Sequence, residues 1–153
     1  MGLNNYYDFA ENDYQFFNQS YTMGIKAPAQ AALGQSICER YLKHIISEYA
    51  NPETDSEFYK KESVLRTHSL HKLTTYLQDD MGIEIPDRIL DELGRIDGFY
   101  FTTRYPGDDS FIATERDIDT ARSAVEYART FTLGIIRQME HEEPSASEDE
   151  PEL

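Results

Sequence analysis

The residues best suited to chemistry in this chain are cations placed where helices should begin or end. Arg104 and Tyr105 precede Pro106, and proline disfavours helical geometry in the residue before it. The preceding helix should therefore end here and hold a permanent cation beside aromatic rings. A guanidinium binds a phosphate or a carboxylate through two parallel hydrogen bonds. Arg104 is thus either part of an anion site or a structural residue that binds the carboxylate of Asp108 or Asp109 and fixes the loop.

A second group of cations lies within thirteen residues and is opposed only by Glu62. Charge runs of this kind usually form a solvated surface, and the alternative is one wall of an anion site. The members of the group are Lys60, Lys61, Arg66, His68, His71 and Lys72.

Two of these residues, His68 and His71, are three positions apart and should lie near one helical face. A catalytic zinc usually needs three protein ligands, and the sequence shows no third, so no metal site is predicted. Lys43 is a further cation that would join the anion site if the second and fourth helices adjoin. It follows Glu39 by four residues, so a local ion pair is expected.

Helices must position these side chains, because the apolar residues recur every three or four positions and no sustained alternation marks a strand. The polar segment 51–66 is predicted to be a loop with at most one helical turn. The five predicted helices cover residues 8–23, 28–49, 67–81, 87–103 and 114–140.

Local sequence predicts several helix ends. Thr67 is a candidate N-cap of the third helix, and Thr114–Asp117 resembles a capping box at the start of the fifth. Gly94 and Gly98 either weaken the fourth helix or permit close packing. Small residues on the fifth helix should let a neighbour approach closely; these are Ala121, Ala124 and Ala128.

The composition indicates a single acidic domain with a tail. The formal net charge is −15, and the segment from Glu140 to Leu153 holds seven acidic residues with no lysine or arginine. We expect a helical domain over residues 1–142 and a disordered acidic tail over 143–153, since Glu, Asp, Ser and Pro cannot form a core. Long-range attraction to nucleic acid and sequence-specific DNA binding are not expected for such a charge.

The compartment is predicted from what the sequence lacks. One cysteine, Cys38, excludes an internal disulfide and fits a reducing compartment. No signal peptide and no apolar run of membrane-spanning length are found. We therefore expect a soluble cytoplasmic protein without membrane contact.

Together these patterns predict an all-α, up-and-down antiparallel bundle of five helices with a disordered acidic C-terminal tail. Several aromatic residues exceed the needs of one bundle, and a homodimer interface would use them. They are Tyr6, Tyr7, Phe9, Tyr14, Phe16 and Phe17.

The order of three motifs resembles the HEPN family, the higher eukaryotes and prokaryotes nucleotide-binding domain. Glu39–Lys43 is similar to the family's Glu-x-x-Leu-Lys helix, His68–Leu73 to its His-x-Leu-x-x-Leu helix start, and Thr103–Pro106 to its Arg-Tyr-Pro exit. The resemblance spans about Asp8 to Met139. It implies a helical bundle that often dimerises and works near nucleotides, RNA or a small nucleotidyltransferase partner.

Many members of the family are ribonucleases of toxin–antitoxin or defence systems that use an Arg-x4–6-His motif near the last helices. This chain departs there, because the only histidine after Arg104 is His141, and its spacing from Arg137 is too short. Four residues separate Arg66 from His71, which matches the motif's spacing. This pair, however, lies at the start of the third predicted helix and not near the last helices.

Three hypotheses about function follow. The first is a non-catalytic binding module for a nucleotide, another anion or a partner protein, with Lys43, His68, Lys72, Arg104 and Tyr105 as binding residues. The second is a metal-independent ribonuclease toxin in which Arg66, His68 and His71 act. The third is a plain helical interaction domain. No cofactor is expected, since no Gly-rich phosphate loop or nucleophile motif is present.

Overall fold

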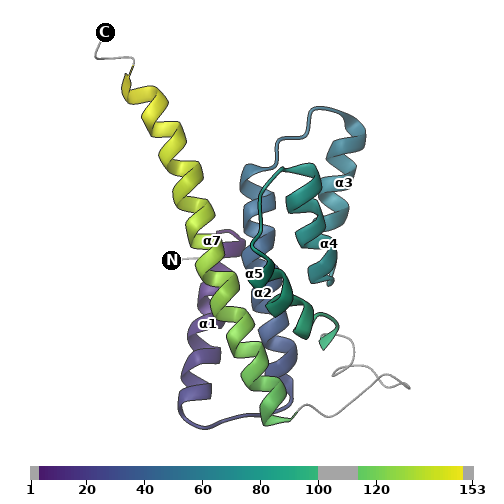
Figure 1. Ribbon diagram of the computed structural model, residues 1–153, viewed down its shortest axis with the longest axis vertical. Coiled ribbons are helices and arrows are strands. Elements are labelled where there is room, and N and C mark those ends of the chain that lie inside the picture. Colours follow the sequence, from purple (N-terminus) through teal and green to yellow (C-terminus); the bar gives the residue numbers. More distant parts are fainter. Residues whose placement is uncertain (1–3, 100–113, 150–153) are drawn as a thin grey trace.

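The computed structural model describes residues 4–99 and 114–149, with side chains described as far as residue 141. Arg104 and Tyr105 lie outside these residues. All regular structure in the described ranges is helical, so the predicted all-α bundle is confirmed (Figure 1). The helices are α1 (Tyr6–Thr22), α2 (Ala29–Tyr49), α3 (Asp55–Leu65), α4 (Leu70–Thr75), α5 (Asp87–Ile96) and α7 (Glu115–Asp149), with a π-helical turn η1 (Tyr76–Asp80) directly after α4.

The centre of the bundle is α2, which packs against α1, α7, α3, α4 and α5. The middle of its apolar stripe is fully buried, as the spacing of three and four residues predicts, and Leu33 and Tyr49 of the same stripe are partly buried. Cys38 is buried within it as a free thiol, and burial raises the pKa of that thiol. The core residues of this stripe are Ile37, Cys38, Tyr41, Leu42, Ile45 and Ile46.

The close approach of α2 to α7 depends on small side chains. Ala121, Ala124 and Ala128 are fully buried, as predicted. A Cβ atom added to Gly34 would lie 2.8 Å from the Cβ of Ala121. Gly34 therefore permits the approach, and nothing in the sequence pattern had singled it out.

The prediction that residues 51–66 form a loop is wrong, because most of them form α3. This helix has no buried residue, so it shows little apolar periodicity. Polar contacts fix it instead. At its N-terminus, the side chain of Thr54 accepts a hydrogen bond from the backbone N–H of Glu57 at 3.1 Å. Lys61 Nζ donates to the carbonyl oxygens of Ser47 and Ala50 at 3.3 and 3.1 Å. Lys61 thereby caps the C-terminus of α2.

Two other predicted boundaries also differ. The N-cap of α4 is Ser69 rather than Thr67, and its side chain accepts from the N–H of Lys72. The helix predicted over 87–103 ends at Ile96, because Gly98 adopts a φ of +102°, a left-handed conformation that breaks a helix.

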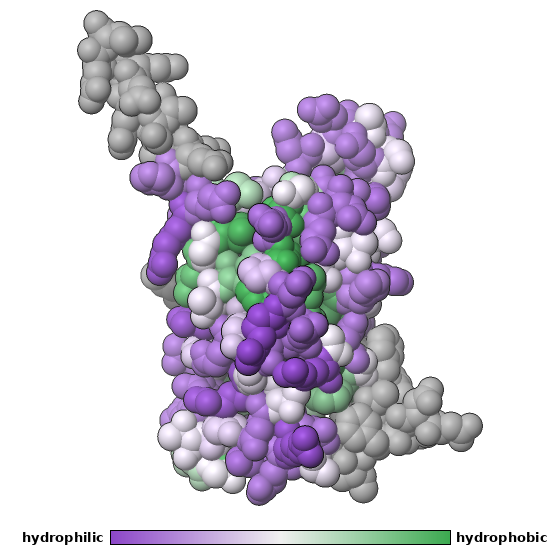
Figure 2. Space-filling view, viewed as in Figure 1, coloured by the Kyte–Doolittle hydropathy of each residue, from purple (hydrophilic) through white to green (hydrophobic). Residues whose placement is uncertain are grey.

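The last helix starts as predicted and runs further than predicted. Thr114 and Asp117 form the capping box, with the backbone N–H of each donating to the side chain of the other. α7 continues to Asp149, beyond the predicted end at Glu140. The division into a helical domain over residues 1–142 and a disordered tail over 143–153 stays a prediction. Figure 2 shows a largely polar face, with apolar side chains gathered beside the upper part of α7. Within the described residues no helix is both long and apolar enough to span a bilayer.

Candidate functional site

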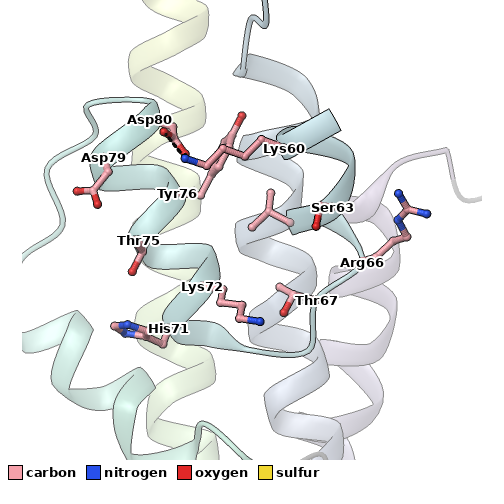
Figure 3. A pocket seen from close by; sticks show the side chains of 11 residues that line it. Lys60, Ser63, Arg66, Thr67, His71, Lys72, Thr75, Tyr76, Asp79 and Asp80 are labelled. Carbon is pink, nitrogen blue, oxygen red and sulfur yellow. Dashed lines mark hydrogen bonds and ion pairs between the residues drawn. The ribbon is translucent and has the colours of Figure 1, made fainter. Parts of the chain in front are cut away.

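The basic segment identified in the sequence lies at a groove between α3 and α4–η1. The groove has a volume of about 640 Å³, which is within the usual range for small-molecule sites. Figure 3 shows Arg66, Thr67, His71 and Lys72 toward one end, and Lys60, Asp79 and Asp80 toward the other. The remaining lining residues are Ser63, Val64, Thr75 and Tyr76.

The two ends of the groove differ in how their charges are compensated. Lys60 Nζ lies 2.9 Å from the carboxylate of Asp80, so this cation is already paired. At the other end, Arg66, His71 and Lys72 form no ion pair with a carboxylate among the described residues. The Nε of Arg66 donates only to the carbonyl oxygen of Glu62, at 3.3 Å. Positive charge at this end is therefore not neutralised by the described part of the protein.

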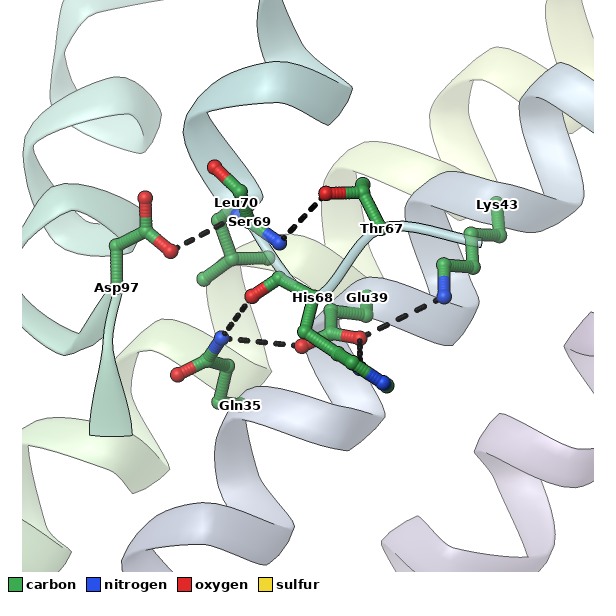
Figure 4. Close-up of polar contacts among 8 residues, drawn as sticks. All are labelled: Gln35, Glu39, Lys43, Thr67, His68, Ser69, Leu70 and Asp97. Atoms are coloured by element: carbon green, nitrogen blue, oxygen red, sulfur yellow. Dashed lines mark hydrogen bonds and ion pairs between the residues drawn. The ribbon is translucent and has the colours of Figure 1, made fainter. Parts of the chain in front are cut away.

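A second polar group, the Glu39 cluster, lies where α2 meets the loop between α3 and α4; it consists of Gln35, Glu39, Lys43 and His68 (Figure 4). Glu39 Oε1 lies 3.1 Å from His68 Nδ1 and 3.6 Å from Lys43 Nζ. Its Oε2 accepts from Gln35 Nε2 at 3.0 Å, and the same nitrogen lies 2.7 Å from the carbonyl oxygen of His68. The expected ion pair between Glu39 and Lys43 is confirmed.

The Glu39 cluster is buried, which sets its electrostatics. The side chain of Glu39 is 3% exposed and that of Lys43 is 9% exposed, whereas His68 keeps 39% of its side chain in solvent. Burial lowers the pKa of Lys43, and the charge of Glu39 acts in the opposite direction. A buried carboxylate needs hydrogen bonds and a counter-charge to remain ionised, and the cluster supplies both. Because a carboxylate only accepts hydrogen bonds, Nδ1 of His68 carries a proton.

One short loop joins the Glu39 cluster to the groove. The carboxylate of Asp97 accepts from the backbone N–H of Leu70 at 2.9 Å and of His71 at 3.0 Å. Thr67 Oγ1 accepts from the N–H of Ser69 at 3.2 Å. The two bonds to Asp97 satisfy N–H groups of the first turn of α4, which no helical carbonyl can reach. The loop is therefore fixed from the α5 side by Asp97 and from the α2 side by the Glu39 cluster.

The described binding residues predicted from the sequence thus fall in two places. Lys72 lines the groove, together with Arg66 and His71 of the ribonuclease hypothesis. Lys43 and His68 belong to the Glu39 cluster. Arg104 and Tyr105 lie outside the residues that the structure describes.

Sequence reasoning missed Asp97 and Gln35 as members of the site. Asp97 lay inside a predicted helix, although the pair Asp97-Gly98 is typical of a turn. Gln35 stands four residues before Glu39, a spacing that predicts contact on a helix. Over the stretches 4–99 and 114–141, no three His, Cys, Asp or Glu side chains are grouped to hold a metal ion.

A comparison with protein-family models finds one match, described as the HEPN domain, at residues 57–135. The matched segment covers about half of the chain; it begins in α3, ends in α7 and includes the whole groove. It leaves out α1 and α2. The comparisons with curated proteins and with solved structures find no significant match.

Proposed function

The chain belongs to the HEPN domain family, and we propose from this premise that it is a non-catalytic module that binds nucleotides through their phosphate groups. The proposed site is the basic end of the groove between α3 and α4. Arg66, His71 and Lys72 would contact the phosphate, with the hydroxyl groups of Ser63 and Thr67 as further donors.

The observation that carries the proposal is the uncompensated positive charge of this end. The whole chain has a net charge of −15, so a surface that keeps three basic side chains without acidic partners is a local exception. Arginine provides a planar fork that fits two phosphate oxygens, and lysine adds a compact charge. The paired Lys60 at the other end provides a comparison within the same groove.

Titration calorimetry with ATP tests this proposal. We expect binding by the wild-type protein and a loss of affinity of roughly tenfold or more in Lys72→Ala and Arg66→Ala, since a hydrogen bond to a charged group contributes about 1.5–3 kcal/mol. Arg137→Ala is the control, because it removes the same charge from an exposed position on α7. It should bind ATP like the wild type, and Lys60→Ala should lose less than Lys72→Ala. Absence of heat with every nucleotide would contradict the proposal.

A second function is favoured by one observation, the contact between His68 and Glu39. A carboxylate that holds Nδ1–H fixes the ring and its tautomer, as a proton-transfer group requires. The alternative function is a metal-independent ribonuclease with Arg66, His68 and His71. It expects RNA cleavage that persists in EDTA and is lost in His68→Ala. RNA left intact by nuclease-free protein would reject it.

We also propose the setting in which the module works. The family resemblance favours a homodimer, a small nucleotidyltransferase as partner protein, and a toxin–antitoxin-like system in the cytoplasm. A nucleotidyltransferase gene beside the gene for this chain would support the two-component system, and co-purification of the two products would test it.

A further inference from the structure

A second cavity, the α4–α5 cavity, lies beside the groove, between α4–η1 and α5. Its volume is about 210 Å³, which is below the roughly 300–1,000 Å³ that is usual for the site of a whole ligand. A space of this size suits one part of a ligand, such as a single ring system.

The α4–α5 cavity and the groove share a wall. His71 and Thr75 line both spaces, and their spacing of four residues places them in one row along α4. Lys72 lines only the groove, and Leu70 lines only the cavity. Figure 3 shows Lys72 extending toward Thr67, with His71 and Thr75 on the other side of α4. One row of side chains thus separates the two spaces, so a single ligand can reach into both.

The walls of the α4–α5 cavity suit a nucleobase better than a phosphate. Leu70, Leu90 and Leu93 supply apolar surface, and no lysine or arginine is found among the described residues that line the cavity. Gln78 is exposed, and its amide forms no hydrogen bond within the described ranges. An amide presents a donor and an acceptor side by side, as the polar edge of adenine requires. Mostly apolar walls with a few polar groups are typical of small-ligand sites.

Gly94 keeps the α5 side of this cavity open. It lines the cavity from an exposed position of α5, and a Cβ atom added to it would meet nothing within 4 Å. Glycine destabilises the interior of a helix, and no packing contact requires it at this position. A larger side chain here would instead extend into the space of the cavity.

We infer that the α4–α5 cavity takes the base of the nucleotide whose phosphate binds at the basic end of the groove. The inference rests on the proposed function and adds a subsite to it. The base packs against the leucines, with its polar edge at Gln78. The ribose crosses the row of His71 and Thr75, whose imidazole and hydroxyl groups form no side-chain hydrogen bond within the described ranges and can bond the sugar hydroxyls.

Titration calorimetry with AMP and with ribose 5-phosphate tests this inference, because the two ligands share the sugar and the phosphate and differ in the base. The variant is Gly94→Leu, which places a side chain in the α4–α5 cavity. Gly134→Leu is the matched control, because Gly134 is an exposed glycine of α7 at which a Cβ atom also meets nothing within 4 Å. Leucine favours a helix more than glycine does, so circular dichroism should show wild-type helix content in both variants.

The measured quantity is the ratio of the two affinities. We expect the wild type and Gly134→Leu to bind AMP at least about tenfold more tightly than ribose 5-phosphate, since the faces of a base add contacts that the bare sugar lacks. In Gly94→Leu the two ligands should bind almost equally.

Equal binding of the two ligands by the wild type would overturn the base subsite and leave the phosphate site in place. A wild-type ratio retained in Gly94→Leu would also overturn it, because the base would then lie elsewhere, as would a lost ratio in Gly134→Leu. Absence of binding by both ligands would overturn the inference together with the proposed function.

Discussion

Glu39 is the residue on which the polar contacts of the Glu39 cluster depend. We expect Glu39→Gln to lower the free energy of unfolding by about 2–4 kcal/mol, because Lys43 would lose its counter-charge in a buried setting. Urea denaturation measures the change. Glu84→Gln, at an exposed position, should stay within about 0.5 kcal/mol of the wild type.

A double variant separates the ion pair from the rest of the cluster. Adding Lys43→Met to Glu39→Gln should recover at least half of the lost stability, since no unpaired ammonium would remain. A double variant as unstable as Glu39→Gln alone would show that the ion pair is not the cause.

His44 gives the stability of the protein a pH dependence. It is almost fully buried, and its Nδ1 finds no hydrogen-bond partner within the described ranges. Burial lowers the pKa of His44 from its ordinary value of 6.5, while the carboxylates of Glu48, Asp8 and Glu140 act in the opposite direction. The rings of Tyr7 and Tyr49 pack against the imidazole.

The unfolded chain therefore binds a proton at His44 more tightly than the folded chain does. This contribution to stability is complete above about pH 6.5 and is lost as the pH falls. We expect His44→Gln to lose less stability than the wild type between about pH 7.5 and pH 5.5 in urea titrations. Parallel curves for wild type and His44→Gln would contradict this account.

At this scale, sequence predicts contacts within a helix and misses those between helices. The pairing of Glu39 with Lys43 follows from a spacing of four residues. The contact of Glu39 with His68 joins α2 to a loop that begins only after α3, so it depends on how the helices pack. The basic run indicated that Lys72 has few acidic neighbours in the sequence. The pairing of Lys60 with Asp80 could not be predicted, because Asp80 lies in the π-helical turn, which the sequence did not indicate.

At the scale of the elements, the loop before α4 depends on a cap from another helix. Asp97→Ala should destabilise the protein by about 1–2 kcal/mol, as loss of helix caps does. It should also speed hydrogen exchange at the amides of Leu70 and His71, which donate to that carboxylate. Asp91→Ala, at an exposed position of α5, is the control. Unchanged exchange at both amides would show that the cap is not needed.

Two glycines in helices should respond to alanine in opposite directions. Gly34→Ala should destabilise by about 1–3 kcal/mol, because its Cβ would press on Ala121 and force α2 and α7 apart. Gly94→Ala meets nothing within 4 Å and should stabilise by roughly 0.5–1 kcal/mol through helix propensity. Thermal unfolding of both variants measures the contrast. A change of the same sign in both would contradict the packing of α2 on α7.

The elements show which physical signals a sequence carries. The bounds of α1 and α2 and the start of α7 were predicted closely, because burial of a stripe imposes the period of 3.6 residues. α3 was missed because none of its residues is buried. The end of α5 was missed because Asp97 and Gly98 were assigned to the helix, whereas Gly98 adopts a left-handed φ of +102° and Asp97 accepts hydrogen bonds from α4.

At the scale of the whole molecule, the acidic charge and the groove act in opposite directions on an anionic ligand. The net charge of −15 repels a nucleotide at long range, while under the proposed function the basic end of the groove would attract it at short range. Added salt screens both interactions. The sequence predicted the acidic body and left the basic run open between a solvated surface and one wall of an anion site. It did not predict that α3 forms the second wall of the groove.

The most direct measurement of the central claim is a nitrogen-15 NMR titration of the full chain with AMP. The account predicts that the largest shift changes fall on backbone amides of the groove, in Ser63–Lys72 and Thr75–Asp80, and disappear in Lys72→Ala. Shift changes that gather on α1 or α7, or a spectrum that AMP leaves unchanged, would contradict it.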